Sequence, residues 1–238
     1  MSARAKAIAP LAIVIGVLSF LWTEFSLNFT FHWVTQQDKV LGDFGVPENF
    51  HLILPIAFIS WGLFFAAGGD NAAFGKIFIA CVFGTVAALI TMYLSFKTAP
   101  FDPATGDAPF WGIALWVGIF AIILVLVLVA GDWYYVAGTF PAFASVFVWW
   151  IATGLDGYVP NGGGSGDKVA AIQGTLTGAP VDAAVGTSGV GAFLGVISTP
   201  WAWVFVSVLA TLICGVILGI VSAKITAAIT PNPRAVEA

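Results

Sequence analysis

The chain has 238 residues, of which 60% are hydrophobic and 8% are charged, and its formal net charge is −4. Soluble globular domains carry about a quarter charged residues, so this composition excludes an ordinary water-soluble enzyme or binding domain. The mean hydropathy of +1.00 instead indicates helices that are surrounded by lipid or by one another.

Apolar stretches, each close to the ~20 residues that a helix needs to cross a bilayer, follow one another along the chain. We predict an all-α fold, a polytopic transmembrane helical bundle of six spans, in a single domain over residues 1–238. The predicted spans are, in chain order, Ala9–Ser26, His51–Gly68, Ile77–Phe96, Phe110–Gly131, Trp133–Thr153 and Pro200–Ser222.

The first apolar stretch, Ala7 to Trp22, follows two basic residues as a signal peptide would. No small-x-small cleavage motif and soluble domain come after it, so we predict a retained first helix. Glu24 is the only acidic residue within a predicted span. It is either a ligand or proton site in an outer vestibule, or a carboxylate that reaches water near the end of its helix.

The second and fifth predicted spans share a short pattern. Ala57-Phe58-x-Ser60 recurs 85 residues later as Ala142-Phe143-x-Ser145. If the repeating unit is three spans, the second copy must enter the membrane from the opposite side, which gives a 3+3 inverted repeat. The alternative is a chance likeness between two sequences drawn from the same few apolar residues.

Small residues recur at helical spacing in the last and fourth spans, as Gly215-x-x-x-Gly219 and Ala114-x-x-x-Gly118. Such pairs predict close helix packing, within the chain or between subunits. Asp70 and Asp132 lie at helix ends, and we interpret both as caps. Most tryptophans are expected at membrane interfaces. Four fall within spans, where they either line a cavity or pack against other helices: Trp61, Trp116, Trp149 and Trp150.

Residues that could perform catalysis are scarce. The two cysteines, Cys81 and Cys214, are far apart in apolar runs, and the histidines His32 and His51 lack metal-ligand spacing. A haem or metal on the histidines is the disfavoured alternative to an interfacial helix start at His51. We therefore predict that the protein is not an enzyme and holds no cofactor and no metal.

Basic residues near the spans predict the orientation. The side that holds both termini has five of them, Arg4, Lys6, Lys76, Lys224 and Arg234, so we expect cytoplasmic termini in a bacterial inner membrane. The opposite side is acidic, which disfavours nucleic acid as a partner. Its acidic residues are Asp38, Asp43, Glu48, Asp102, Asp107, Asp156, Asp167 and Asp182.

The segment Val-Ala-Gly-Thr-Phe at 136–140 resembles the Val-Pro-Gly-Thr-Phe segment of the bacterial inner-membrane family called domain of unknown function 1097. Residues 60–66 and 218–220 are similar to other helices of that family. Here Ala137 replaces the family's proline, and the outer Gly-rich loop at 155–198 is an addition. The resemblance implies a small multi-span membrane protein of unassigned function.

The loop at 155–198 begins with a flexible glycine-rich run and ends in an apolar one. It is interpreted as an ordered outer surface loop, with a lid, a re-entrant segment or a subunit contact as alternatives.

For function, we expect a channel or facilitator for a small neutral or cationic solute, acting as a homo-oligomer in contact with membrane lipid. The candidate pore or ligand residues are Glu24, Ser60, Trp61, Thr139 and Ser145. The alternative is a structural or accessory subunit that contacts other membrane subunits.

Overall fold

A computed structural model of the chain describes residues 3–34, 41, 44–47, 49–100, 110–153 and 201–230. Within these residues the protein is all-helical, without a β-strand, so the predicted helical architecture is confirmed for this part of the chain. The α-helices are α1 (Ala3–Asn28), α2 (Leu54–Ala66), α3 (Asn71–Thr98), α4 (Trp111–Leu126), α5 (Val136–Ala152) and α7 (Trp201–Ile229).

Helix α1 extends beyond its predicted end at Ser26 and continues into a π-helix, Phe29–Val34. Much of its surface is exposed and apolar, as at Ile13 and Phe20. Trp22, by contrast, is buried, and its Nε1 donates to the carbonyl of Leu54 at 3.3 Å. This contact attaches α1 to the beginning of α2.

Helix α2 is shorter than predicted, since it begins at Leu54 and ends at Ala66. Pro55 lies in its first turn, where a missing N–H leaves no hydrogen bond unmade, and Ile53 before it has an extended backbone with φ −103° and ψ 100°. At 1.5 Å per residue the helix is ~20 Å long, well short of the ~30 Å thickness of a hydrocarbon core. The chain before it, residues 50–53, is not helical, so the expected helix start at His51 is wrong.

A tight turn joins α2 to α3. Gly68 and Gly69 adopt φ values of +122° and +70°, which side chains rarely allow. Asp70 then caps α3, because its side chain accepts a hydrogen bond from the amide of Ala73 at 2.7 Å. The predicted capping role of Asp70 is confirmed, and α3 starts six residues before the expected Ile77.

Helix α4 ends in a 3-10 turn, Val127–Ala130, and stops at Gly131. Helix α5 begins only at Val136, and the residue at its N-cap position, Tyr135, makes no side-chain capping bond. The predicted capping role of Asp132 is therefore wrong. The chain between the two helices is held by Tyr134 instead, whose hydroxyl donates to the carbonyl of Leu124 at 2.7 Å.

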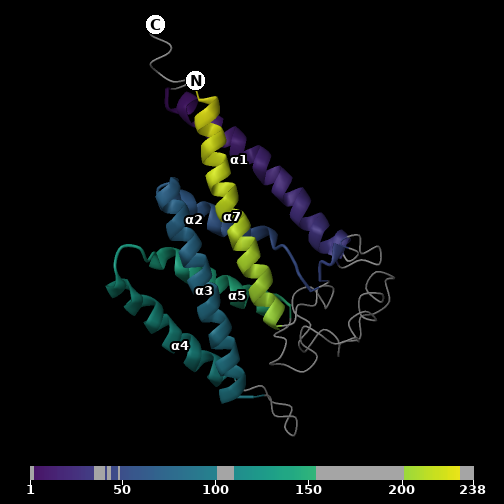
Figure 1. Ribbon diagram of the computed structural model, residues 1–238, viewed down its shortest axis with the longest axis vertical. Helices are drawn as coiled ribbons and strands as arrows, with labels where there is room; N and C mark the ends of the chain where they lie inside the picture. The colour runs from purple at the N-terminus through teal and green to yellow at the C-terminus, as the bar shows by residue number, and fades with distance from the viewer. Residues whose placement is uncertain are drawn as a thin grey trace.

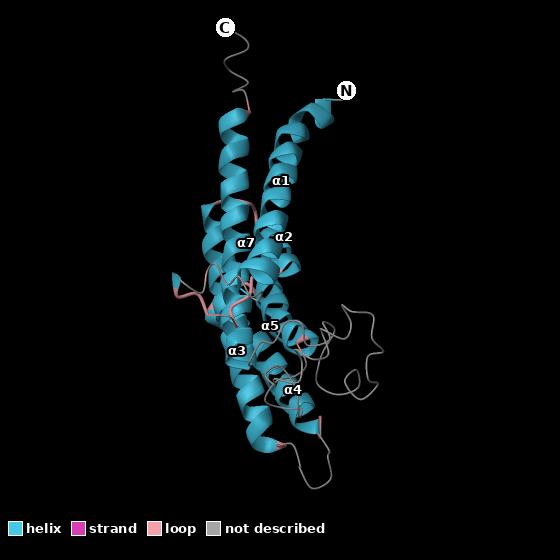
Figure 2. Ribbon diagram, turned by 90° about the vertical axis from the view of Figure 1, so that its right-hand side faces the viewer, coloured by secondary structure: helices cyan, strands magenta, loops and turns pink. Residues whose placement is uncertain are grey.

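The two longest helices, α3 and α7, lie side by side at the centre and run in opposite directions (Figure 1). Helix α5 packs against α3, and α2 packs against α7. The outer helices follow the same division, since α4 contacts α3 and α1 contacts α7. The start of α1 and the end of α7 lie at the same end of the molecule (Figures 1 and 2).

Glycines set the closest helix contacts. A Cβ at Gly215 of α7 would collide with the carbonyl oxygen of Ala57 and the hydroxyl of Ser60, and one at Gly219 would lie 2.7 Å from the ring of Phe64. The close approach predicted from Gly215-x-x-x-Gly219 is confirmed, and its partner is α2. The fourth span differs, because a Cβ at Gly118 would meet nothing within 4 Å, so this glycine packs against no other helix of the chain's described part.

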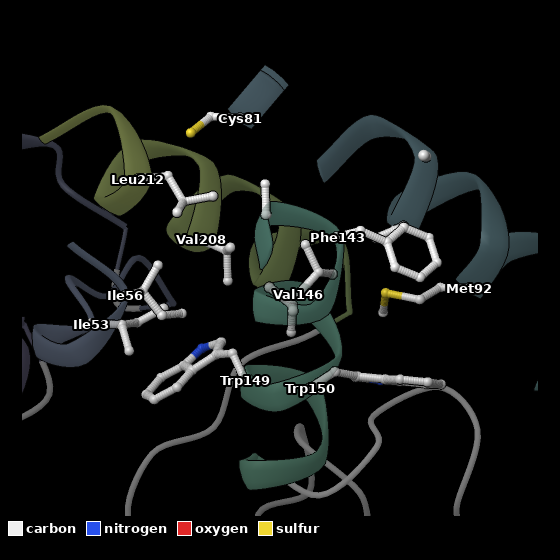
Figure 3. Packing of buried hydrophobic residues seen from close by; sticks show 14 of the residues in the cluster. Ile53, Ile56, Cys81, Met92, Phe143, Val146, Trp149, Trp150, Val208 and Leu212 are labelled. Atoms are coloured by element: carbon white, nitrogen blue, oxygen red, sulfur yellow. The ribbon is translucent and has the colours of Figure 1, made fainter. Parts of the chain in front are cut away.

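Buried side chains from α2, α3, α5 and α7 form one hydrophobic core. Two neighbouring tryptophans of α5 point to different sides of it (Figure 3). Trp149 lies toward Ile53 and Ile56, whereas Trp150 lies toward Met92 of α3. Adjacent residues on α5 thus pack against two different helices, α2 and α3.

Four helices are long and apolar enough to cross a membrane: Ile8–Asn28, Asn71–Thr98, Trp111–Ala130 and Trp201–Ile229. Helices α2 and α5 are apolar but shorter. The outer surface is apolar as well, on α4 and in the 3-10 turn that follows it, where Val129 is 91% exposed. Several apolar helices with apolar outer faces are compatible with a membrane protein.

Candidate functional site

The feature that departs most from a regular bundle is the non-helical segment of residues 50–53, which lies inside it. His51 is fully buried, and Leu52 and Ile53 are nearly so. Backbone amides in such a place lack both water and helical partners, and leaving them unpaired is unfavourable. The protein must supply hydrogen-bonding groups from elsewhere in the chain.

Helix α7 supplies two of these groups. The hydroxyl of Ser207 accepts from the amide of His51 at 3.0 Å, and the hydroxyl of Thr211 accepts from the amide of Ile53 at 3.1 Å. Ser207 and Thr211 are four residues apart and therefore lie on one face of the helix. Thr211 also donates to the carbonyl of Ser207 at 2.7 Å, so its hydroxyl is fixed in both directions.

The third group comes from the π-helix that follows α1. The hydroxyl of Thr30 accepts from the amide of Leu52 at 3.0 Å and donates to the carbonyl of the same residue at 2.8 Å. Three consecutive amides, from His51 to Ile53, thus bond to hydroxyls on two other helices. An irregular backbone at the depth of a bilayer is tolerated only under such conditions.

The segment borders a cavity of about 310 Å³ between the end of α1, the first turn of α2 and the last turns of α5. Its walls are apolar except for Thr30, and Trp149 forms part of one wall. The ring of Trp149 also meets the ring of His51 edge-on, with 6.2 Å between centroids. Of the four tryptophans expected within spans, Trp149 is the one that lines this cavity.

Two of the predicted site residues, Ser60 and Trp61, join α2 to α7. The Ser60 hydroxyl donates to the carbonyl of Leu212 at 2.7 Å, and Trp61 Nε1 donates to the hydroxyl of Ser222 at 3.1 Å. Both side chains are buried. They form part of the contact between helices and are absent from the lining of the 310 Å³ cavity.

The other predicted residues lie elsewhere. Thr139 and Ser145 are buried on α5 and donate to carbonyls one turn earlier, of Tyr135 and Pro141. Glu24 is exposed on α1, where Asn28 donates to its carboxylate at 2.9 Å. The structure therefore does not gather the five candidates into one site.

Sequence reasoning missed Thr30, Ser207 and Thr211. Their signal was present, because hydroxyls spaced by four residues face one side of α7, and Pro55 marks a helix start later than the hydropathy suggests. Hydroxyl side chains are common in apolar helices, however, where they bond their own backbone. Thr85, Thr91 and Ser95 of α3 do so here.

No charged side chain is buried in the described part of the chain. Its buried polar side chains are hydroxyls and the imidazole of His51, while the charged residues whose side chains are described are exposed. No group of three His, Cys, Asp or Glu residues within the described ranges is placed to hold a metal ion. The side chain of His32 and the loop at 155–198 lie outside the described residues.

No known family model matches the chain, and no curated protein or solved structure is significantly similar to it. The resemblance to the domain of unknown function 1097 family therefore stays an expectation.

Proposed function

We propose that the protein is a six-span facilitator of the bacterial inner membrane, built from two inverted three-helix halves, that moves a small uncharged solute as a homo-oligomer. In this proposal α1, α2 and α3 form the first half, and α4, α5 and α7 form the second. The short helices α2 and α5 complete their crossings through the non-helical chain at their ends. Membership of the family resembled at residues 136–140 is part of the proposal.

The packing of the helices supports two related halves. Exchanging α1 with α4, α2 with α5 and α3 with α7 turns each major contact into another observed one. The contact of α3 with α5 becomes that of α7 with α2, and the contact of α3 with α4 becomes that of α7 with α1. The opposite directions of α3 and α7 agree with a twofold axis in the membrane plane (Figure 1).

Individual residues support the same relation. Ala57 of α2 contacts Gly215 of α7, and Ala142, the counterpart of Ala57 after 85 residues, contacts Gly84 of α3. A Cβ at Gly84 would lie 2.9 Å from that of Ala142 and would collide with the carbonyl oxygen of Thr139. Equivalent short helices therefore meet equivalent long helices at a glycine.

The observation that carries the transport function is the buried non-helical segment held by hydroxyls. Transporters with inverted repeats place their substrate sites at interrupted helices near the membrane centre. Here the non-helical residues 50–53 lead directly into α2. Helix α2 in turn contacts α5 of the other proposed half. A neutral solute fits better than the cationic alternative, because no described charged side chain is buried at the segment.

The test is solute flux into proteoliposomes, across a series of urea, glycerol and short amides. The protein should raise flux above that of protein-free liposomes, and Thr211→Val should change the rate because Ile53 loses its hydroxyl partner. Gly62→Ala is the control, since a Cβ there meets nothing within 4 Å. Equal flux with and without protein for all solutes would refute the proposal.

The second candidate is a structural subunit of a larger membrane assembly. Thr139 and Ser145 favour it, because their buried hydroxyls bond only their own helix in the described hydrogen bonds. The exposed small-residue face of α4, with Ala114 and Gly118, could then receive a helix from another protein. A partner that co-purifies in mild detergent at fixed stoichiometry, together with absent flux, would support this function instead.

A further inference from the structure

The cavity beside residues 50–53 has a chemistry that limits what it can hold. Its volume of about 310 Å³ is at the lower end of the ~300–1,000 Å³ of small-molecule sites. Thr30 is its one polar lining residue, and the hydroxyl of Thr30 is engaged with both backbone groups of Leu52. A ligand that needs hydrogen bonds would lose them on entering, so the cavity favours hydrocarbon.

The mouth of the cavity lies on the outer surface of the bundle. Leu27 of α1 and Val148 of α5 both line the cavity and are 40% and 62% exposed. In the proposed topology this surface faces the acyl chains of the bilayer. A ligand would therefore enter sideways from lipid and would not cross an aqueous vestibule.

A second apolar pocket lies at the corresponding place in the other half. It is formed by the end of α4 and by Phe140 near the start of α5, and its volume is about 390 Å³. Phe140 is the counterpart of Pro55 after 85 residues, and Pro55 lines the first cavity. The second pocket is shallow, since its lining residues Ile122 and Leu126 are largely exposed.

We infer that the cavity between α1, α2 and α5 binds a hydrocarbon chain, which enters from the bilayer between Leu27 and Val148. This inference goes beyond the proposed function and rests on it only in that these helices must lie in lipid. Two lining residues connect the cavity to the buried segment, since Ile53 belongs to the segment held by Ser207 and Thr211 and the ring of Trp149 meets that of His51. Occupancy is thereby linked to this segment.

The test is photolabelling of the full chain in nanodiscs, with labelled residues mapped by mass spectrometry. One arm uses a free diazirine-bearing alkane, and the other uses a phospholipid with a diazirine in its acyl chain. Labelling should concentrate on residues 52–56 and 148–152 and should saturate. Labelling in the first arm alone identifies a free solute, and labelling in the second identifies a lipid chain, and both support the site.

Two variants close the cavity by different means. Ala152→Phe fills it from the end of α5, and Val148→Trp covers its mouth from an exposed position that tolerates a large side chain. Each should lower labelling of residues 52–56 about tenfold, equivalent to a tenfold weaker affinity. Ala137→Phe, at an exposed position on the same helix, is the matched control and should leave labelling unchanged.

Labelling that rises linearly without saturation, or that survives in both closing variants, would overturn the inference. The flux measurement separates this result from the proposed function. Flux of urea or amides that persists while labelling fails refutes the hydrocarbon site alone. Labelling that succeeds while flux is absent refutes transport and leaves the site standing.

Discussion

Thr30 and Leu52, which are 22 residues apart, are joined by two hydrogen bonds through a single hydroxyl. The hydroxyl accepts from the Leu52 amide and donates to the Leu52 carbonyl, so one side chain satisfies both polar groups of one buried residue. In a helix, the neighbouring turns would supply the hydrogen-bond partners of the Leu52 amide and carbonyl. Here the Thr30 hydroxyl supplies both. The buried non-helical segment is stable because hydroxyls replace the helical partners.

Thr30→Val should destabilise the protein by about 1–3 kcal/mol, because a shape-matched side chain leaves a buried amide and carbonyl without partners. The measurement is the free energy of unfolding in detergent. Thr30→Ser keeps the hydroxyl, so its free energy of unfolding should fall much less. If Val and Ser variants were equally stable, the hydroxyl would not be what holds Leu52.

Gly215→Ala should separate α2 from α7. The new Cβ would collide with the backbone oxygen of Ala57, which cannot move as a flexible side chain can, so we expect a loss of about 1–3 kcal/mol or more. Gly118→Ala is the control, because its Cβ meets nothing and helical alanine is favoured by about 0.5–1 kcal/mol over glycine. Thermal unfolding midpoints that fall equally in both would contradict the contact.

Gly84→Ala tests the corresponding contact in the other half. Its Cβ would meet Thr139 and Ala142 of α5, so this change should lower the unfolding midpoint as Gly215→Ala does. Gly75→Ala is the control on the same helix. A Cβ there meets nothing within 4 Å, so the unfolding midpoint should not fall. A tolerated Gly84→Ala beside a damaging Gly215→Ala would argue against equivalent halves.

Ser222→Ala should cost about 1–3 kcal/mol, because the buried Nε1 of Trp61 loses its acceptor. The same change in a Trp61→Phe background should cost much less, since no indole N–H remains. A double-mutant cycle on unfolding free energies measures this coupling. Additive effects would show that the Trp61–Ser222 bond contributes nothing.

The proposed six-span topology predicts where single cysteines react. In a background with Cys81→Ala and Cys214→Ala, Lys76→Cys should react with a membrane-impermeant thiol reagent only from the cytoplasmic side. Lys97→Cys, at the far end of α3, should react only from the outside. Both positions are exposed. Reaction of both from one side would mean that α3 does not cross the membrane.

Hydropathy was sufficient to predict a helical bundle, because a run of apolar residues without charge leaves helices as the way to pair the backbone. It could not place the ends of α2. Residues 51–53 are followed directly by an apolar run and themselves give no sign of a break, and their distant partners Thr30, Ser207 and Thr211 hold them in a non-helical conformation. Asp132 was misread for a similar reason, because Tyr134 and its bond to Leu124 decide where α5 begins.

The candidate site was harder to predict. Ser60 and Trp61 were selected as polar groups within an apolar span, and they are indeed buried, but their partners are helix α7 and not a cavity. A cavity has no sequence signal when its walls are apolar, since Leu27 and Val148 look like any lipid-facing residues. Only the folded arrangement shows that they share a space with Trp149.

The hydroxyls of α7 also impose an order on biosynthesis. Ile53 leaves the ribosome 158 residues before Thr211, its hydrogen-bond partner. At about 5–20 residues per second, that interval lasts roughly 8–30 s. In the proposed topology, the nascent chain must meanwhile keep the amides of residues 51–53 hydrated or sheltered by the insertion machinery, so the span that contains α2 reaches its final structure only after α7 has been made.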